Sequence, residues 1–367
     1  GNAILTVYSA LMGIAGAREG VSTSVLARHS FGRDGSKLVG LVAAITMLGW
    51  YAVQVGFFGE TMHTMFPGAG FITSVKFAGL WGGILMMVTA YHGYKGLATL
   101  SKIAVPAIIG LSIWGMTLAV SAKGGWGALM AMKPTTQMTL GSAAVLIVGS
   151  FAGGGACQAD ITRYAKDAKS VWVSSLIGYL GANSFIIVAG MVTSMAVGSA
   201  DLPYVLLQLG LGIPALIVLI SAQWTSNDNN LYTASLGFSN LTQLEKNKIV
   251  IILGIIATIV GVMGMADYFI PFLTVLGIAI PPMAGIIIAD YYIVHKGSYK
   301  FGPGTKYSKI NFIGILSWII ATIVGFVVTA GIQSFNSLIC AFVLYIALGK
   351  LNLKLSYGEH IESDTGF

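Results

Sequence analysis

Nine consecutive residues bring polar chemistry into an otherwise apolar stretch. The run Ala222-Gln223-Trp224-Thr225-Ser226-Asn227-Asp228-Asn229-Asn230 holds seven polar side chains. The adjacent hydroxyls of Thr225 and Ser226, with the backbone carbonyl of Ala222 one turn earlier, offer oxygen ligands of the kind that a small hard cation such as Na⁺ prefers. The alternative is that the run is the polar end of a helix, which suits its last two residues better than the two hydroxyls.

A second unusual stretch is rich in glycine: Val148-Gly149-Ser150-Phe151-Ala152-Gly153-Gly154-Gly155. Each glycine costs about 1 kcal/mol relative to alanine in a helix interior. We therefore expect the helix to break here, so that free backbone N–H and C=O groups line a binding site beside Ser150 and Phe151. The alternative is a close helix–helix crossing through glycine faces.

A third group of residues combines an aromatic ring with an amide. Trp50 and Gln54 are four residues apart, so they project from one face of a helix. A flat indole beside a donor and acceptor pair suits a flat heterocyclic ligand. An interhelical hydrogen bond made by Gln54 is the alternative reading.

The remaining side chains give little indication of an enzyme active site. There is no Gly-x-Ser-x-Gly motif and no spaced aspartate dyad in the apolar segments, and Cys157 and Cys340 lie far apart. We expect Asp160, Asp228 and Asp290 to lie near helix ends, Asp160 pairing with Arg163. The five histidines lack metal-ligand spacing; they are His29, His63, His92, His295 and His360.

Composition identifies the elements that must position these groups. Charged residues make up 9% of the 367 residues and hydrophobic residues 56%, with a mean hydropathy of +0.82. A soluble domain carries roughly 25% charged residues, so a nucleic-acid-binding protein and a cytosolic enzyme are excluded. Glycine, at 48 residues, favours tightly packed membrane helices.

The apolar residues form long helical segments rather than strands, because they lack the alternation of a membrane barrel. Most of the segments reach the length of about 20 residues that a membrane helix needs. We predict eleven segments: 1–17, 38–65, 71–91, 97–121, 139–164, 171–197, 212–238, 248–265, 268–294, 310–331 and 335–350.

Charge in the connectors predicts the orientation of these segments. Seventeen of the 20 Lys and Arg residues fall on one side, and only Lys76, Lys123 and Lys133 on the other. This asymmetry places the C-terminus in the cytoplasm of a cell (inner or plasma) membrane and residue 1 outside. Since the chain opens in apolar sequence without Met, we expect a fragment that has lost at least one preceding helix.

Several motifs resemble the nucleobase–cation symport family, specifically its purine/cytosine permease group. They are the stretch 149–151, the run 224–229, and Ile280-Pro281-Pro282-Met283-Ala284-Gly285-Ile286-Ile287-Ile288-Ala289-Asp290-Tyr291. The resemblance implies an all-α integral membrane protein with the inverted-repeat fold of the leucine-type transporters. About 11 of an expected 12 transmembrane helices would be present. Residues 1–121 would then be the rest of the first repeat, 139–294 the second repeat and 310–350 two additional helices.

The same resemblance implies roles for individual residues. Trp50 and Phe151 would sandwich the substrate, with Gln54, Gly149, Ser150 and Asn227 around its edge. Ala222, Thr225 and Ser226 would bind sodium. Met47 departs from the cytosine permeases, which carry Gln there, and Gln54 instead resembles hydantoin and fungal purine-related members.

We therefore expect a membrane-embedded symporter, not an enzyme, that needs no cofactor other than its coupling ion. It would import a neutral nucleobase such as cytosine together with Na⁺, and act as a monomer. The alternatives left open are proton coupling, a hydantoin, allantoin, purine or other heterocycle as substrate, an amino-acid symporter, and a passive channel.

Overall fold

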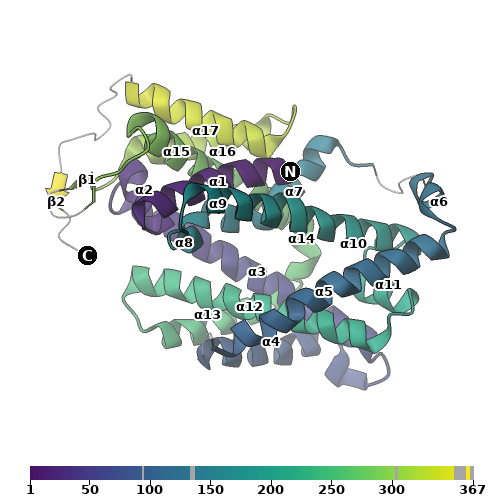
Figure 1. Cartoon of the computed structure of the whole chain (residues 1–367). Helices are drawn as coiled ribbons and strands as arrows, with labels where there is room; N and C mark the ends of the chain where they lie inside the picture. The colour runs from purple at the N-terminus through teal and green to yellow at the C-terminus, as the bar shows by residue number, and fades with distance from the viewer. Residues whose placement is uncertain (93–94, 133–136, 302–304, 351–360, 364–367) are drawn as a thin grey trace. The chain divides into compact units, whose positions relative to one another are not determined.

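The computed structural model describes residues 1–92, 95–132, 137–301, 305–350 and 361–363, and these residues are predominantly helical (Figure 1). The α-helices are α1 (Asn2–Glu19), α2 (Thr23–Phe31), α3 (Gly35–Met65), α4 (Val75–His92), α5 (Lys95–Ala122), α6 (Trp126–Met130), α7 (Leu140–Ala156), α8 (Gln158–Thr162), α9 (Ala168–Ser175), α10 (Ser184–Val197), α11 (Leu202–Gln208), α12 (Gly212–Thr242), α13 (Lys246–Val262), α14 (Phe269–Ala279), α15 (Pro281–Ile288), α16 (Phe312–Val327) and α17 (Gln333–Lys350).

Tighter and wider helical turns connect several of these elements. η1 (Gly70–Thr73) and η3 (Met265–Tyr268) are 3₁₀-helices, whereas η2 (Leu176–Asn183) and η4 (Ala289–Val294) are π-helices. Two short antiparallel strands, β1 (Lys306–Ser308) and β2 (Ile361–Ser363), form a small ladder that the sequence did not predict.

Each predicted apolar segment coincides with a helix or with a run of consecutive helices. Segment 139–164 contains α7 and α8, and segment 171–197 contains most of α9 together with η2 and α10. Within the described residues, five helical stretches are long and apolar enough to cross a membrane: Gly35–Met65, Val105–Ala122, Ala168–Val197, Met265–Val294 and Gln333–Lys350. α7 and α16 are shorter apolar helices. The number of crossings stays a prediction.

The chain divides into two compact units, each built from separate parts of the sequence. Unit 1 comprises Gly1–Ala43, Met138–Asn183 and Ile270–Phe367, and unit 2 comprises Ala44–Gln137 and Ser184–Phe269. Each unit therefore contains residues from both predicted repeats. The repeats themselves are not visible in this division and stay a prediction.

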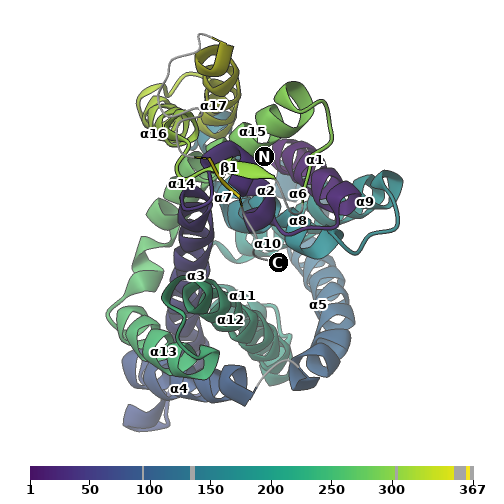
Figure 2. The same ribbon diagram turned by 90° about the vertical axis from the view of Figure 1, so that its left-hand side faces the viewer.

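Small residues allow the helices of unit 1 to pack closely. A Cβ atom on Gly16 of α1 would lie 2.5 Å from Cβ of Ala159 in α8. A Cβ atom on Gly285 of α15 would lie 2.7 Å from the carbonyl oxygen of Leu338 in α17. α15, α16 and α17 consequently lie side by side (Figures 1 and 2).

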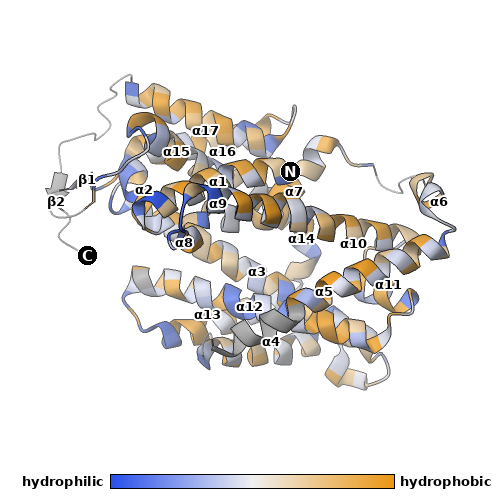
Figure 3. Cartoon of the chain, viewed as in Figure 1, coloured by the Kyte–Doolittle hydropathy of each residue, from blue (hydrophilic) through white to orange (hydrophobic). Residues whose placement is uncertain are grey.

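Unit 2 is organised around a core shared by α3, α4, α12 and α13. Its fully buried side chains include Tyr51 and Phe58 of α3, Met86 of α4 and Leu231 of α12. Figure 3 shows a hydrophilic stretch within α12, next to more hydrophobic turns. This stretch is the polar run found in the sequence.

Polar side chains fix where several helices begin. Thr139 and Asp167 accept hydrogen bonds from the backbone N–H groups of Ser142 and Ser170, at 3.1 and 2.7 Å. Such N-caps satisfy backbone donors that have no partner inside the helix. α7 and α9 therefore start where the sequence supplies a cap.

Candidate functional site

The glycine-rich stretch does not break the helix that contains it. α7 continues without interruption from Leu140 to Ala156, and the break falls at Cys157, before α8 begins at Gln158. The backbone N–H of Cys157 donates to the carbonyl oxygen of Gly153 at 3.0 Å, which closes the last turn of α7. The predicted break at 149–155 is therefore wrong.

Close packing explains why this stretch contains glycine. A Cβ atom on Gly149 would collide with the backbone carbonyl of Leu273 in α14. One on Gly155 would lie 2.5 Å from Oγ of Ser9 and 2.7 Å from the hydroxyl of Tyr8, both in α1. These two glycines therefore support the alternative, in which glycine allows two helices to cross closely.

Phe151 and Ser150 lie on this continuous helix rather than beside free backbone groups. The hydroxyl of Ser150 donates to the carbonyl oxygen of Ile147 at 2.7 Å, within its own helix. Phe151 is 47% exposed, and its ring meets the ring of Tyr179 edge to face. Phe151 is thus available for stacking, whereas the ligand-binding backbone predicted around Ser150 is absent from the described part of α7.

The break between α7 and α8 borders a small apolar pocket within unit 1. Residues from four helices line it, among them Thr23, Val42, Cys157, Met283 and Ile287. Among the side chains that line the pocket, only the Cys157 thiol and the Thr23 hydroxyl are polar. The pocket therefore favours apolar contacts over binding of a charged group.

Trp50 and Gln54 lie in the middle of α3, in unit 2. The ring of Trp50 contacts the ring of Phe269 at a centroid distance of 5.9 Å and an angle of 71°. Gln54 is half-buried, and no hydrogen-bond partner for its amide occurs among the residues that the structure describes. The alternative reading, an interhelical hydrogen bond of Gln54, is therefore not found among the described residues, and the amide donor and acceptor are available to a ligand.

The polar run lies within α12, which is regular throughout. The hydroxyl of Thr225 donates to the carbonyl oxygen of Ala222 at 3.0 Å, so two of the three predicted cation ligands are adjacent. Ser226 is exposed, and it follows Thr225 on the next position of the helix. Three oxygen atoms thus lie within about one turn of α12. Because the helix is regular here, its backbone offers no unpaired groups as additional ligands.

Asn227 points into the core of unit 2. Its side chain is fully buried, and its amide nitrogen donates to the carbonyl oxygen of Tyr51 at 3.3 Å and to the sulfur of Met86 at 3.2 Å. The Oδ1 atom of Asn227 is buried without a partner in the described structure. Its nitrogen therefore links α12 to α3 and α4, and the predicted contact between Asn227 and a substrate stays untested.

Asp228 is not at a helix end, contrary to the prediction. It is fully buried near the middle of α12, and its Oδ1 atom accepts a hydrogen bond from the hydroxyl of Thr89 at 2.8 Å. The indole N–H of Trp224 donates to the same hydroxyl at 3.0 Å. No sequence motif singled out Thr89, although a threonine deep in an apolar segment is a detectable signal.

Asp160 also differs from its predicted role. Its carboxylate accepts a hydrogen bond at 2.8 Å from the backbone N–H of Thr23, at the start of α2. Within the described residues, no ion pair joins it to Arg163, whose guanidinium lies over the ring of Tyr164. Asp160 therefore ties α8 to α2.

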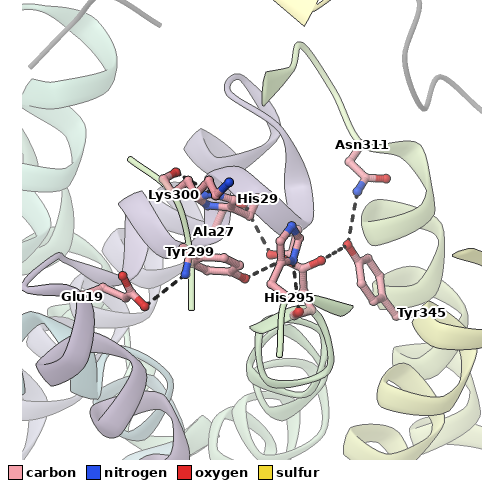
Figure 4. Close-up of polar contacts among 10 residues, drawn as sticks. Glu19, Ala27, His29, His295, Tyr299, Lys300, Asn311 and Tyr345 are labelled. Carbon is pink, nitrogen blue, oxygen red and sulfur yellow. Dashed lines mark hydrogen bonds and ion pairs between the residues drawn. The ribbon is translucent and has the colours of Figure 1, made fainter. Parts of the chain in front are cut away.

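The third aspartate, Asp290, is fully buried at the centre of a polar cluster in unit 1. Figure 4 labels its partners His295, Tyr299 and Tyr345. Its carboxylate accepts hydrogen bonds from the hydroxyls of Tyr299 at 2.5 Å and Tyr345 at 2.7 Å, and lies 3.4 Å from Nδ1 of His295. The ring of His29 stacks on that of Tyr299 at a centroid distance of 3.7 Å. These contacts link α2, the start of η4, the loop that follows η4, and α17.

The pKa values of the two histidines in this Asp290 cluster are shifted in opposite directions. Burial lowers the pKa of His29 to about 4, whereas the hydrogen bond to Asp290 raises the pKa of His295. His29 is therefore neutral near pH 7. His295 is the group that gains positive charge against the buried carboxylate.

Comparison with known proteins identifies the family. The family model described as a permease for cytosine/purines, uracil, thiamine and allantoin matches residues 1–349. The chain is 34% identical over 367 residues to the cytosine permease of Escherichia coli K12, an alignment that covers all of this chain and 86% of that protein.

Solved structures show the same fold. An inward-facing structure of Mhp1 matches with a TM-score of 0.82 at 20% identity, covering 95% of this chain and 81% of that protein. A closed structure of Mhp1, titled a nucleobase-cation-symport-1 family transporter with bromovinylhydantoin bound, matches with a TM-score of 0.75 over 95% of this chain and 83% of that protein. The leucine-transporter-type fold predicted from the sequence is confirmed.

Proposed function

Because this chain belongs to the family of permeases for cytosine, purines, uracil, thiamine and allantoin, and is a multi-pass membrane transporter rather than an enzyme, we propose that it imports cytosine by symport with Na⁺. The observation that carries this proposal is the 34% identity to a cytosine permease along the whole chain. A location in the inner membrane with a cytoplasmic C-terminus, and a monomeric state, belong to the same proposal.

The proposed substrate site uses two aromatic rings, those of Trp50 and Phe151. Base–aromatic stacking contributes about 1–3 kcal/mol per base in single-stranded nucleic-acid complexes, and comparable stacking would suit a flat nucleobase here. Gln54 supplies a free donor and acceptor for the edge of the base. A heterocycle with the wrong edge would leave this amide unpaired, which is the basis of specificity.

The proposed cation site uses the carbonyl of Ala222 and the hydroxyls of Thr225 and Ser226. Ala222 and Thr225 already lie in contact, which supports a shared ligand. Three oxygens incompletely surround a sodium ion, so further ligands from outside α12 complete the proposed site. If the ion and the substrate favour the same conformation, each tightens the binding of the other.

Uptake into proteoliposomes tests this function. We expect radiolabelled cytosine to accumulate above equilibrium when an inward Na⁺ gradient is imposed, and not when K⁺ replaces Na⁺. Unlabelled cytosine should compete more strongly than allantoin, a hydantoin or adenine. Accumulation driven by a proton gradient alone would refute sodium coupling, and equilibration without accumulation would indicate a channel.

Variants at the two rings test the site itself. Trp50→Ala and Phe151→Ala should each weaken cytosine binding and uptake together, because both remove a stacking surface. Trp318→Ala is a suitable control, since its indole N–H donates to the carbonyl of Ala279 outside the proposed site. Normal cytosine binding by both ring variants would exclude the stacked arrangement.

A further inference from the structure

The ring of Phe151 receives no side-chain support from the next turn of its own helix. Side chains three and four positions along a helix normally pack against one another. At these positions α7 carries Gly154 and Gly155, and a Cβ atom on Gly154 would lie 4.0 Å from Cδ1 of Phe151. On this side, only another element can hold the ring in a defined orientation.

Tyr179 supplies this support from the π-helix η2. The centroids of the Phe151 and Tyr179 rings lie 6.0 Å apart with an interplanar angle of 76°. This is an edge-to-face geometry that aromatic pairs prefer. Phe151 nevertheless stays 47% exposed, so part of its ring is accessible to a stacked ligand.

A hydrogen bond fixes Tyr179 in turn. Its hydroxyl donates to Oε1 of Gln158 at 2.8 Å, and Gln158 is the first residue of α8. Tyr179 therefore contacts Phe151 before the break at Cys157 and Gln158 directly after it. The orientation of the Phe151 ring is tied to the geometry of the break.

We propose that Tyr179 is a positioning residue that holds the Phe151 ring in the plane needed to stack on the substrate. This inference rests on the proposed function, in which Phe151 contacts the nucleobase. Unit 2 has a comparable arrangement, because Phe269 contacts the Trp50 ring edge to face and also meets Phe57 at 5.2 Å. Each proposed stacking ring thus has an aromatic neighbour in its own unit.

A double-mutant cycle on the full chain tests the proposal by equilibrium binding of radiolabelled cytosine. Tyr179→Leu should weaken binding about two- to tenfold, the effect expected from losing one edge-to-face pair. In the Phe151→Leu background, Tyr179→Leu should have no further effect. Tyr179→Phe keeps the ring and should retain more binding than Tyr179→Leu.

The cycle separates a positioning role from a general effect on stability. Tyr164→Leu is the matched control, because it removes a tyrosine ring that is 78% exposed in the same unit, and it should bind cytosine normally. Wild-type binding by Tyr179→Leu, or effects of the two leucine variants that simply add, would overturn the proposal while leaving the stacking role of Phe151 in place. Wild-type binding by Phe151→Leu would overturn both.

Tyr179→Phe keeps the test decisive if Tyr179→Leu does not fold. Loss of the hydroxyl removes the hydrogen bond to Gln158 and keeps the ring, so we expect binding to weaken about twofold and the melting temperature to fall slightly. Cytosine binding equal to that of the wild type would then overturn the anchoring of Tyr179.

Discussion

The glycine-rich stretch of α7 offers a direct test of why glycine occurs at each position. Gly149 faces the backbone carbonyl of Leu273, so the methyl group of Gly149→Ala would push α7 away from α14. Gly154 faces only Cδ1 of Phe151, at an ordinary contact distance of 4.0 Å. The same substitution at these two positions should therefore have opposite effects.

The expected magnitudes follow from two opposing contributions. Alanine is about 1 kcal/mol more favourable than glycine in a helix interior. An extra methyl group in a tightly packed core costs about 1–3 kcal/mol, and a backbone carbonyl cannot rotate away as a side chain can. We expect Gly149→Ala to lose up to about 2 kcal/mol of stability, near that upper limit because the clash is with backbone, and Gly154→Ala to gain up to about 1 kcal/mol.

Thermal unfolding of the purified protein in detergent measures both effects, and no substrate is needed. The melting temperature should fall for Gly149→Ala and stay level or rise for Gly154→Ala. Equal losses for the two variants would refute the packing explanation, because a broken helix would require glycine at both positions. A Gly149→Ala variant as stable as the wild type would refute the close approach of α7 and α14.

Three further outcomes are expected. Asn227→Ala should lower the melting temperature measured without substrate, because it removes the hydrogen bond to the Tyr51 carbonyl, which is worth roughly 0.5–1.5 kcal/mol. An unchanged melting temperature would show that this hydrogen bond does not stabilise the core of unit 2. Thr225→Val should reduce the stimulation of uptake by Na⁺ while leaving folding intact, and an unaltered sodium dependence would argue for protons. Because Asp290 raises the pKa of His295 above 6.5, the stability from this pair is fully present below pH 6.5 and is lost as pH rises through the raised pKa. His295→Gln should flatten this dependence in melting experiments, and a persistent slope would assign it to another group.

The sequence by itself determined the class of protein and the positions of its helices. Long apolar segments with few charges can be satisfied in lipid only by helices, so the helical architecture follows from composition and segment length. The motifs then identified the family, which the full-length comparison confirmed. Local caps such as Thr139 and Asp167 further determined where helices start.

Only the tertiary structure decided what the unusual residues do. A glycine permits both a broken helix and a close crossing, and the choice depends on whether a neighbouring backbone approaches, as that of Leu273 does at Gly149. A buried aspartate and one at a helix end look identical in sequence, and the position of Asp228 became clear only from its contacts with Thr89. The Asp290 cluster joins residues far apart in the chain, and such contacts leave no local pattern because they depend on how the helices pack.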